Sequence, residues 1–251
     1  MAKPVDVTVI VNAHREGLIA TATLKSVELA MTAALSHNVR AELLVVLDRP
    51  DQETRDVISA WSVTDADARL LEVDVGDPGL ARNAGVNISR GRWIAFLDAD
   101  DLFGSNWLWK AHEAATAETR EVVWHPEANL YFGASPHVLT HVDMEAPDVD
   151  PLAICNHNLW TAPCFASREV LLRIPYRATE FDKQIGYEDW GWNIEIMASG
   201  ILHKVVPATA HAIRTKPVSV VSRTTQAACL PYPTRMFREI LDKRSRAAPL
   251  P

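Results

Sequence analysis

The sequence contains few cysteines, and their spacing gives no sign of pairing. The three thiols belong to Cys155, Cys164 and Cys229, which form no CxxC motif. An odd number of cysteines in a chain of 251 residues argues against the disulfide framework that is typical of small secreted domains. We therefore expect reduced thiols and a cytoplasmic location.

The sequence also lacks a signal-peptide pattern and an excess of basic residues. The apolar stretch in MAKPVDVTVIVNAHRE is interrupted too soon for a signal peptide, and we expect no apolar run of the ~20 residues that span a bilayer. With 25 basic and 32 acidic residues, the net charge is -7. Nucleic-acid binding depends on a basic surface that neutralises phosphates, so we expect no nucleic-acid partner.

Glycine-rich phosphate-binding motifs are missing too. No GxxxxGK segment occurs among the 10 glycines, which argues against a P-loop. The segment GDPGLARNAG lacks the GxGxxG spacing of a dinucleotide-binding turn. An anionic ligand would therefore depend on backbone N–H groups, a few arginines or a metal ion.

The first half of the chain, residues 1–118, alternates short β-branched runs with helical patterns. Strands are expected at Val5–Val11, Glu42–Leu47, Arg69–Val73 and Arg92–Leu97, and helices at Gly17–Leu35, Gln52–Trp61 and Leu80–Ile88. The apolar runs are continuous, as in strands that are covered on both faces. This alternation predicts an α/β fold whose central sheet is mostly parallel, with helices on both faces. Ligands of such sheets bind beyond the carboxyl ends of the strands.

The second half, residues 119–232, is less regular. Strands are expected at Glu121–Trp124 and Leu159–Ala166, and a helix at Asp189–Ala198. We expect one domain over residues 1–232, followed by a basic tail, 233–251, with a helix at about Arg235–Arg244. The segment TRMFREILDKRSR is partly amphipathic, so this helix is either solvated or in peripheral contact with an anionic membrane surface.

An acidic cluster follows the fourth expected strand, in FLDADD. Asp98, Asp100 and Asp101 repel one another unless a cation or hydrogen-bond donors offset their charge. Mg²⁺ and Mn²⁺ take oxygen ligands, commonly one or two carboxylates together with substrate phosphates. The alternative is a solvated turn that caps a helix near Ser105. The position directly after a buried strand favours the metal–phosphate interpretation.

A second cluster lies in GYEDWGW, where Glu188 and Asp189 are flanked by aromatic residues. The two acids are suited to a general base held near an acceptor hydroxyl, with aromatic faces as a platform for a sugar ring. They are equally suited to the start of a helix, where the dipole favours negative charge. The residues alone leave both interpretations open.

These two segments resemble glycosyltransferase family 2, the inverting enzymes of GT-A fold. GLARNAGVNISRGRWIAFLDADD is similar to the family's Arg-Asn-Gly stretch, short helix and strand that ends in a DxD motif. GYEDWGWNIEIMASG is similar to the family's Glu-Asp motif and the helix after it. The similarity covers about Val7 to Asp101 and about Leu159 to Arg223. It implies a GT-A fold, the Rossmann-like fold of nucleotide-diphospho-sugar transferases, with a nucleotide-binding half (1–118) and an acceptor-binding half (119–232).

The resemblance also implies roles for individual residues. The nucleotide-sugar site would comprise Ala13, His14, Glu16, Asp48, Arg82, Asp98 and Ala99. The metal, Mn²⁺ or Mg²⁺, would be held by Asp100, Asp101 and His211. Asp189 would be the general base, with Glu188 beside it. Trp190 and Trp192 would lie on the acceptor side, or else pack in the core.

The implied reaction is a single displacement that inverts the anomeric centre. A sugar would move from a nucleotide-diphosphate sugar, with UDP as the nucleotide, to a hydroxyl of a carbohydrate or lipid-linked saccharide, as in polysaccharide biosynthesis. Transfer of single residues is expected, because the QxxRW motif of processive synthases does not occur. The alternatives are a metal-dependent nucleotidyl- or phosphoryl-transfer enzyme and a non-catalytic relative that binds nucleotide sugars.

Overall fold

The computed structural model describes residues 4–62, 68–217 and 219–237. Its strands are β1 Val7–Ala13, β2 Ala41–Asp48, β3 Ala68–Val73, β4 Trp93–Asp98, β5 Leu102–Phe103, β6 Val122–Gly133, β7 His137–Thr140, β8 Phe165–Ser167 and β9 Leu202–Thr215. Its α-helices are α1 Ala20–Ser36, α2 Gln52–Ser62, α3 Pro78–Ile88, α4 Trp107–Ala117, α5 Arg168–Arg173, α6 Glu188–Ala198 and α7 Val220–Gln226. Three short 3₁₀ helices are η1 Gly17–Ile19, η2 Pro151–Cys155 and η3 Phe181–Lys183.

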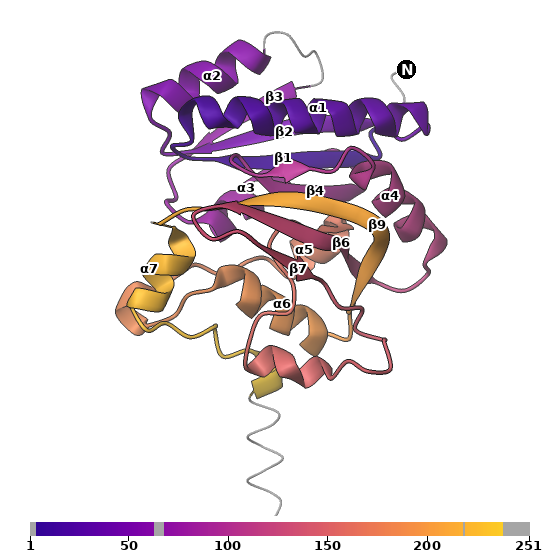
Figure 1. The fold of residues 1–251 in the computed structure, drawn as a ribbon, viewed down its shortest axis with the longest axis vertical. Helices are drawn as coiled ribbons and strands as arrows, with labels where there is room; N and C mark the ends of the chain where they lie inside the picture. The colour runs from indigo at the N-terminus through magenta and orange to yellow at the C-terminus, as the bar shows by residue number, and fades with distance from the viewer. Residues whose placement is uncertain (1–3, 63–67, 218, 238–251) are drawn as a thin grey trace, which may run out of the picture.

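One mixed sheet runs through both halves of the chain (Figure 1), in the order β3-β2-β1-β4-β8-β6-β9-β5 with β7 beside β6. The pairs β1–β2, β2–β3 and β1–β4 are parallel, as the sequence predicts. The short strand β8 runs antiparallel between β4 and β6, so β6 points in the same direction as β4. Since β9 is parallel to β6, the carboxyl ends of β1, β2, β4, β6 and β9 all lie at one edge of the sheet.

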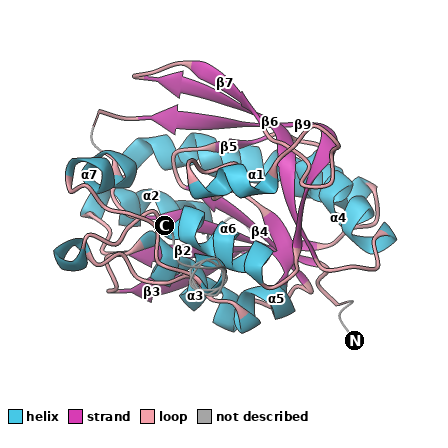
Figure 2. Cartoon of the chain, turned by 90° about the horizontal axis from the view of Figure 1, so that it is seen from below, coloured by secondary structure: helices cyan, strands magenta, loops and turns pink. Residues whose placement is uncertain are grey.

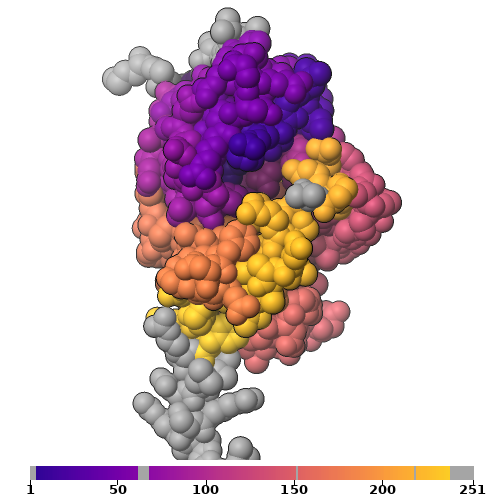
Figure 3. Space-filling view, turned by 90° about the vertical axis from the view of Figure 1, so that its left-hand side faces the viewer, coloured from indigo at the N-terminus to yellow at the C-terminus, as the bar shows by residue number. Residues whose placement is uncertain are grey.

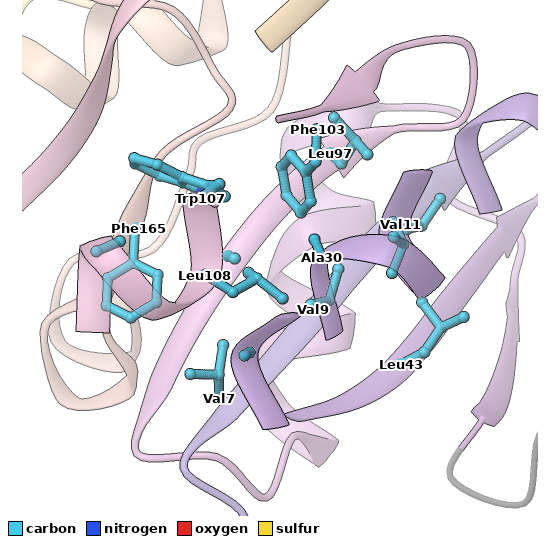
Figure 4. Close-up of a cluster of buried hydrophobic side chains, with 14 of the residues drawn as sticks. Val7, Val9, Val11, Ala30, Leu43, Leu97, Phe103, Trp107, Leu108 and Phe165 are labelled. Carbon is cyan, nitrogen blue, oxygen red and sulfur yellow. The ribbon is translucent and has the colours of Figure 1, made fainter. Parts of the chain in front are cut away.

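The sheet is covered on both faces, which explains its continuous apolar runs. Val7, Val9 and Val11 of β1 face a core formed with α1, α2 and α4 (Figure 4). Ile10, between them, faces a second core formed with α3, α5 and α6. The strict alternation along β1 shows that two apolar layers, rather than one, fix the position of this strand.

Helix α1 and the turn before it, Gly17–Ser36, are long and apolar enough to cross a membrane by length and composition, with a mean hydropathy of 1.4. Lys25 and Glu28 interrupt the apolar residues of this segment, so the expectation that no apolar run reaches about 20 residues stays a prediction. Leu24, Val27 and Ala30 are buried in the core, whereas Leu29 and Leu35 are exposed. Within this fold, the segment is the crossover helix between β1 and β2.

The second half departs more from the sequence-based expectations. The strand expected at Glu121–Trp124 is the beginning of the longer β6, and only the end of the segment Leu159–Ala166 is a strand, β8. The hairpin of β6 and β7 extends to one side of the sheet (Figure 2). The helix expected at Arg235–Arg244 lies largely outside the described residues.

Candidate active site

Polar side chains gather where the carboxyl ends of the strands meet. Figure 3 shows the surface recessed where the indigo and violet N-terminal half meets the yellow segment that contains α7. The backbone N–H of Ala99 donates to the carbonyl of Asn12 at 2.9 Å, which joins the ends of β4 and β1. Ala13 and Ala99 are both buried. These two small residues thus form part of the packed base beneath the polar groups.

Arg82 on α3 lies at the centre of this edge. Its side chain is 2% exposed, and it donates from Nη1 to Oε1 of Glu188 and from Nη2 to Oδ1 of Asp98, each at 3.0 Å. Although burial opposes its charge, Asp98 and Glu188 hold the pKa of Arg82 well above its ordinary value. Asp77 caps α3 by accepting from the N–H of Leu80. The capped helix thus presents a permanent cation to both halves of the site.

Glu188 and Asp189 begin helix α6, directly after Tyr187, whose φ of 55° is left-handed. Burial and the adjacent charge of Asp189 raise the pKa of Glu188 to about 7. Burial also raises the pKa of Asp189, and Arg82 opposes this shift. The side-chain amide of Asn158 donates to Oδ2 of Asp189 at 3.1 Å. Asp189 therefore combines a raised proton affinity with a fixed orientation, as a general base requires.

The acidic turn after β4 is paired with basic residues at the end of β9. The ammonium of Lys216 lies 2.6 Å from Oδ2 of Asp100, and Nη1 of Arg214 lies 3.6 Å from the same oxygen. Asp101 accepts a hydrogen bond from the backbone N–H of Arg214 at 2.7 Å. Burial and the charge of Asp98 raise the pKa of Asp101 well above its ordinary value. The negative charge of this turn is thus only partly neutralised.

His211 does not join the acidic turn as a ligand. Its ring is 1% exposed and packs against Phe103 and Trp107, with centroid distances of 4.8 Å, and burial lowers its pKa to about 3. Among residues 4–62, 68–217 and 219–237, no three or more His, Cys, Asp or Glu side chains form a group able to hold a metal ion. The expected ligand set of Asp100, Asp101 and His211 is therefore not assembled, and a metal at Asp100 would need oxygen ligands from the substrate.

The residues expected to contact the nucleotide lie at the ends of β1 and β2. The carboxylate of Asp48 accepts hydrogen bonds from the backbone N–H groups of Val75, Gly76 and Asp77 at 2.9–3.2 Å. The Asp48 carboxylate therefore fixes the conformation of the loop before α3. His14, which is exposed, donates from Nδ1 to the carbonyl of Asp48.

Glu16 lies next to the acidic turn rather than at the loop before α3. Burial raises its pKa, and Asp100 and Asp98 are close enough to add to that shift. The structure thus brings Glu16, Asp98 and Asp100 together, with Lys216 among them.

The two tryptophans expected on the acceptor side belong mainly to packed regions. Trp192 is 4% exposed, stacks on Tyr176 at 4.8 Å and donates to the carbonyl of Ile174. Trp190 is partly buried and donates to the carbonyl of Ile154 at 2.6 Å. Trp192 is therefore a core residue, which is the second of the two places expected for it.

Three residues reach the site that the sequence did not single out: Tyr131, Asn158 and Lys216. Tyr131, on β6, has its pKa raised by burial and lies close enough to Asp101 and Asp189 to be influenced by both charges. Asn158 comes from an irregular loop, and Lys216 follows the last residue of β9. None of the three belongs to a local sequence motif. Each reaches the site only because of the position of a strand or loop that the sequence did not predict.

Comparison with known proteins relates the first half of the chain to a family. Residues 8–128 match the family model Glycosyl transferase family 2. Succinoglycan biosynthesis protein ExoO of Rhizobium meliloti (strain 1021) is 34% identical over 118 residues, which are 47% of this chain and 32% of that protein. This chain thus matches about a third of the length of that curated relative.

Solved structures share the fold. Staphylococcus aureus TarS 1–349 in complex with UDP-GlcNAc has a TM-score of 0.66 and 16% identity, over 94% of this chain and 64% of that one. GalNAc-T7 with UDP, GalNAc and Mn²⁺ has a TM-score of 0.59 and 15% identity, over 85% and 44%. At these identities the likeness establishes the fold, which is that of the GT-A glycosyltransferases.

Proposed function

We propose that this chain, in which residues 8–128 form a glycosyl transferase family 2 domain, moves one sugar from a nucleotide-diphosphate sugar to an acceptor hydroxyl with inversion. The nucleotide is UDP, as in the complexes of the structural neighbours. The acceptor is a carbohydrate or lipid-linked saccharide of polysaccharide biosynthesis, in line with the similarity to ExoO, a succinoglycan biosynthesis protein. The site is cytoplasmic.

One observation carries this proposal: Arg82 joins Asp98 at the end of β4 to Glu188 at the start of α6. The acids of the donor side and of the acceptor side therefore share one buried cation. A base for the acceptor and charged groups for the donor must lie in the same cleft for direct transfer. A non-catalytic binder of nucleotide sugars has no need of a base beside the donor site.

In the proposed reaction, Asp189 accepts the proton of the acceptor hydroxyl. The acceptor oxygen forms its bond to the anomeric carbon while the bond from that carbon to the diphosphate oxygen breaks on the opposite face, and the electron pair leaves with the nucleoside diphosphate. Asn158 donates to Asp189 Oδ2 at 3.1 Å and the backbone N–H of Trp190 donates to Oδ1 at 2.8 Å, so one lone pair on each oxygen is left for the hydroxyl. Arg82 keeps Glu188 and Asp98 in place and stays charged throughout.

A divalent metal fits the chemistry of the acidic turn. Asp98 and Asp100 offer the carboxylate oxygens that Mg²⁺ and Mn²⁺ prefer, but two basic side chains lie against Asp100 and the metal would have to displace at least one of them. When bound by Asp100 and the donor phosphates, the metal supplies charge neutralisation for the departing diphosphate.

The test is a screen of nucleotide sugars against the purified chain. We expect a UDP-sugar, in the presence of Mn²⁺, to raise the melting temperature more than nucleotide sugars with other bases. NMR of the product formed on an oligosaccharide acceptor should then show the anomeric configuration opposite to that of the donor. Retention of configuration, or release of pyrophosphate instead of UDP, would contradict the proposal.

A further inference from the structure

The ion pair between Lys216 and Asp100 raises a question about how a metal reaches the acidic turn. Asp100 is almost fully buried, with 7% of its side chain exposed, whereas 34% of the Lys216 side chain is exposed. The 2.6 Å separation places the ammonium in direct contact with Oδ2, and Arg214 lies 3.6 Å from the same oxygen. A divalent ion at that oxygen would be in contact with the ammonium, so the two cations exclude each other.

The surroundings explain why a cation is held there. Glu16, Asp98 and Asp101 all lie near Asp100, and burial raises the pKa of both Glu16 and Asp101. Although partial burial opposes its charge, contact with Asp100 raises the pKa of Lys216. With its ammonium 2.6 Å from Asp100, Lys216 is a counter-ion for a group of acids that would otherwise repel one another.

Lys216 is also able to leave. It follows the last residue of β9, it is bound to Asp100 by a single ammonium, and its four-carbon stem is flexible. Arg214 differs, because its guanidinium lies farther from the same oxygen, at 3.6 Å. An ammonium released from Asp100 would lie next to the place where the donor phosphates meet the metal.

On the basis of the proposed function, we propose that Lys216 and the divalent metal compete for Asp100, and that the metal moves Lys216 from Asp100 onto the diphosphate of the donor. The free chain thus carries an internal cation that keeps its metal affinity low until the donor arrives. The donor and the metal then bind cooperatively, because the diphosphate offers the displaced ammonium a new partner.

The experiment measures the binding of Mn²⁺ alone, by electron paramagnetic resonance of the free ion, to the wild type, Lys216→Met and Lys216→Arg. Lys216→Met should bind Mn²⁺ on the order of tenfold more tightly, which corresponds to about 1.4 kcal/mol. Lys216→Arg keeps a cation and should stay closer to the wild type. The matched control is Lys204→Met, because Lys204 lies on β9, the strand that precedes Lys216, and its ammonium pairs with Glu145 instead.

A second titration measures UDP binding at saturating Mn²⁺. Here Lys216→Met should bind UDP several-fold more weakly than the wild type does, because the variant has no ammonium to contact the diphosphate. Tighter metal binding together with weaker UDP binding is a combination that a purely structural loss does not produce. Unchanged or weaker Mn²⁺ binding by Lys216→Met would overturn the proposal, as would unchanged UDP binding.

The variant Asp100→Asn separates this inference from the proposed function. If it binds Mn²⁺ as well as the wild type, Asp100 does not hold the metal and that part of the proposed function fails. If it loses Mn²⁺ while Lys216→Met matches the wild type, only the competition fails. Near-UV circular dichroism of each variant shows whether the fold is intact.

Discussion

Arg82 donates from Nη1 to Oε1 of Glu188 at 3.0 Å, although the two residues lie 106 positions apart in the chain. The contact connects the helix after β3 with the helix that carries the proposed base. Because both side chains are nearly inaccessible, at 2% and 9% exposure, neither charge is screened by water. This pair therefore affects stability as well as the arrangement of the site.

Replacing Arg82 with Met should destabilise the fold strongly. The change leaves Glu188 without its buried counter-ion and removes the partner of Asp98, and loss of one partner of a buried pair costs about 3–5 kcal/mol. Urea unfolding at pH 7 measures the change in free energy. The control is Arg173→Met, whose exposed pair with Glu121 should cost less than about 1 kcal/mol. Equal losses of unfolding free energy in the two variants would show that the buried Arg82 pairs stabilise the fold no more than an exposed pair does.

Asp189→Asn should lose on the order of 10²–10⁴-fold in turnover, the usual contribution of a general base. The amide keeps the shape of the carboxylate but does not accept the proton, so UDP-sugar binding should persist. The measurement pairs initial rates with calorimetry of the donor. Asp182→Asn, which changes an exposed acid in η3, is the matched control and should keep full activity. An active Asp189→Asn variant would remove this residue from the mechanism.

Asn158→Ala should change the pH dependence of the reaction. The amide donates to Oδ2 of Asp189 and so stabilises its charged form, and without it the already raised pKa of Asp189 rises further. The acidic limb of kcat/KM should therefore move to higher pH, with activity recovering when the pH is raised. Asn156→Ala, in the same loop, should leave the profile in place. A uniform loss of activity at all pH values would mean that Asn158 acts only on the fold.

The first half of the fold was predictable as far as β4 because its signals are local, whereas β5 and α4 were not among the expected elements. Continuous apolar runs mark the buried strands, and Asp77-Pro78 supplies a helix cap with proline at the first helical position. The structure also brings Asp98, Arg82 and Glu188 together, as the family motifs imply. These residues lie at the ends of elements whose positions the sequence defines well.

The second half was less predictable because its long strands carry buried polar residues. In β6 the apolar run is broken by His125, Pro126 and Asn129, and in β9 by His203 and His211. Each of these residues is hydrogen-bonded or packed in the tertiary structure, and no local sequence pattern predicts those contacts. The two strands carry Tyr131 and Lys216 into the site, so these residues could not be found without the sheet order. For the same reason, the direction of the His211 side chain could not be predicted.

The buried histidines give the last prediction, which concerns acid stability. His203 donates from Nε2 to the carbonyl of Asn193, so its Nδ1 accepts from Nε2 of His125 at 2.9 Å, and both rings are neutral. Burial lowers the pKa of His203 to about 3, that of His141 to about 4 and that of His125 well below its ordinary value.

A histidine whose pKa is lowered by folding binds its proton only in the unfolded chain, so its contribution to stability is present above about pH 6.5 and is lost as the pH falls below that value. Each such histidine should reduce the free energy of unfolding by about 1.4 kcal/mol per pH unit between pH 6 and 5. Glu188, whose pKa is raised to about 7, acts in the opposite direction by taking up a proton in the folded state. Urea unfolding at pH 6 and pH 5 gives the change in the free energy of unfolding per pH unit. In His203→Gln this slope should be smaller than in the wild type by the equivalent of about one bound proton. The exposed control His157→Gln should match the wild type. Equal slopes in all three proteins would mean that the His203 ring is already protonated in the folded chain, because a ring that is already protonated takes up no proton on unfolding.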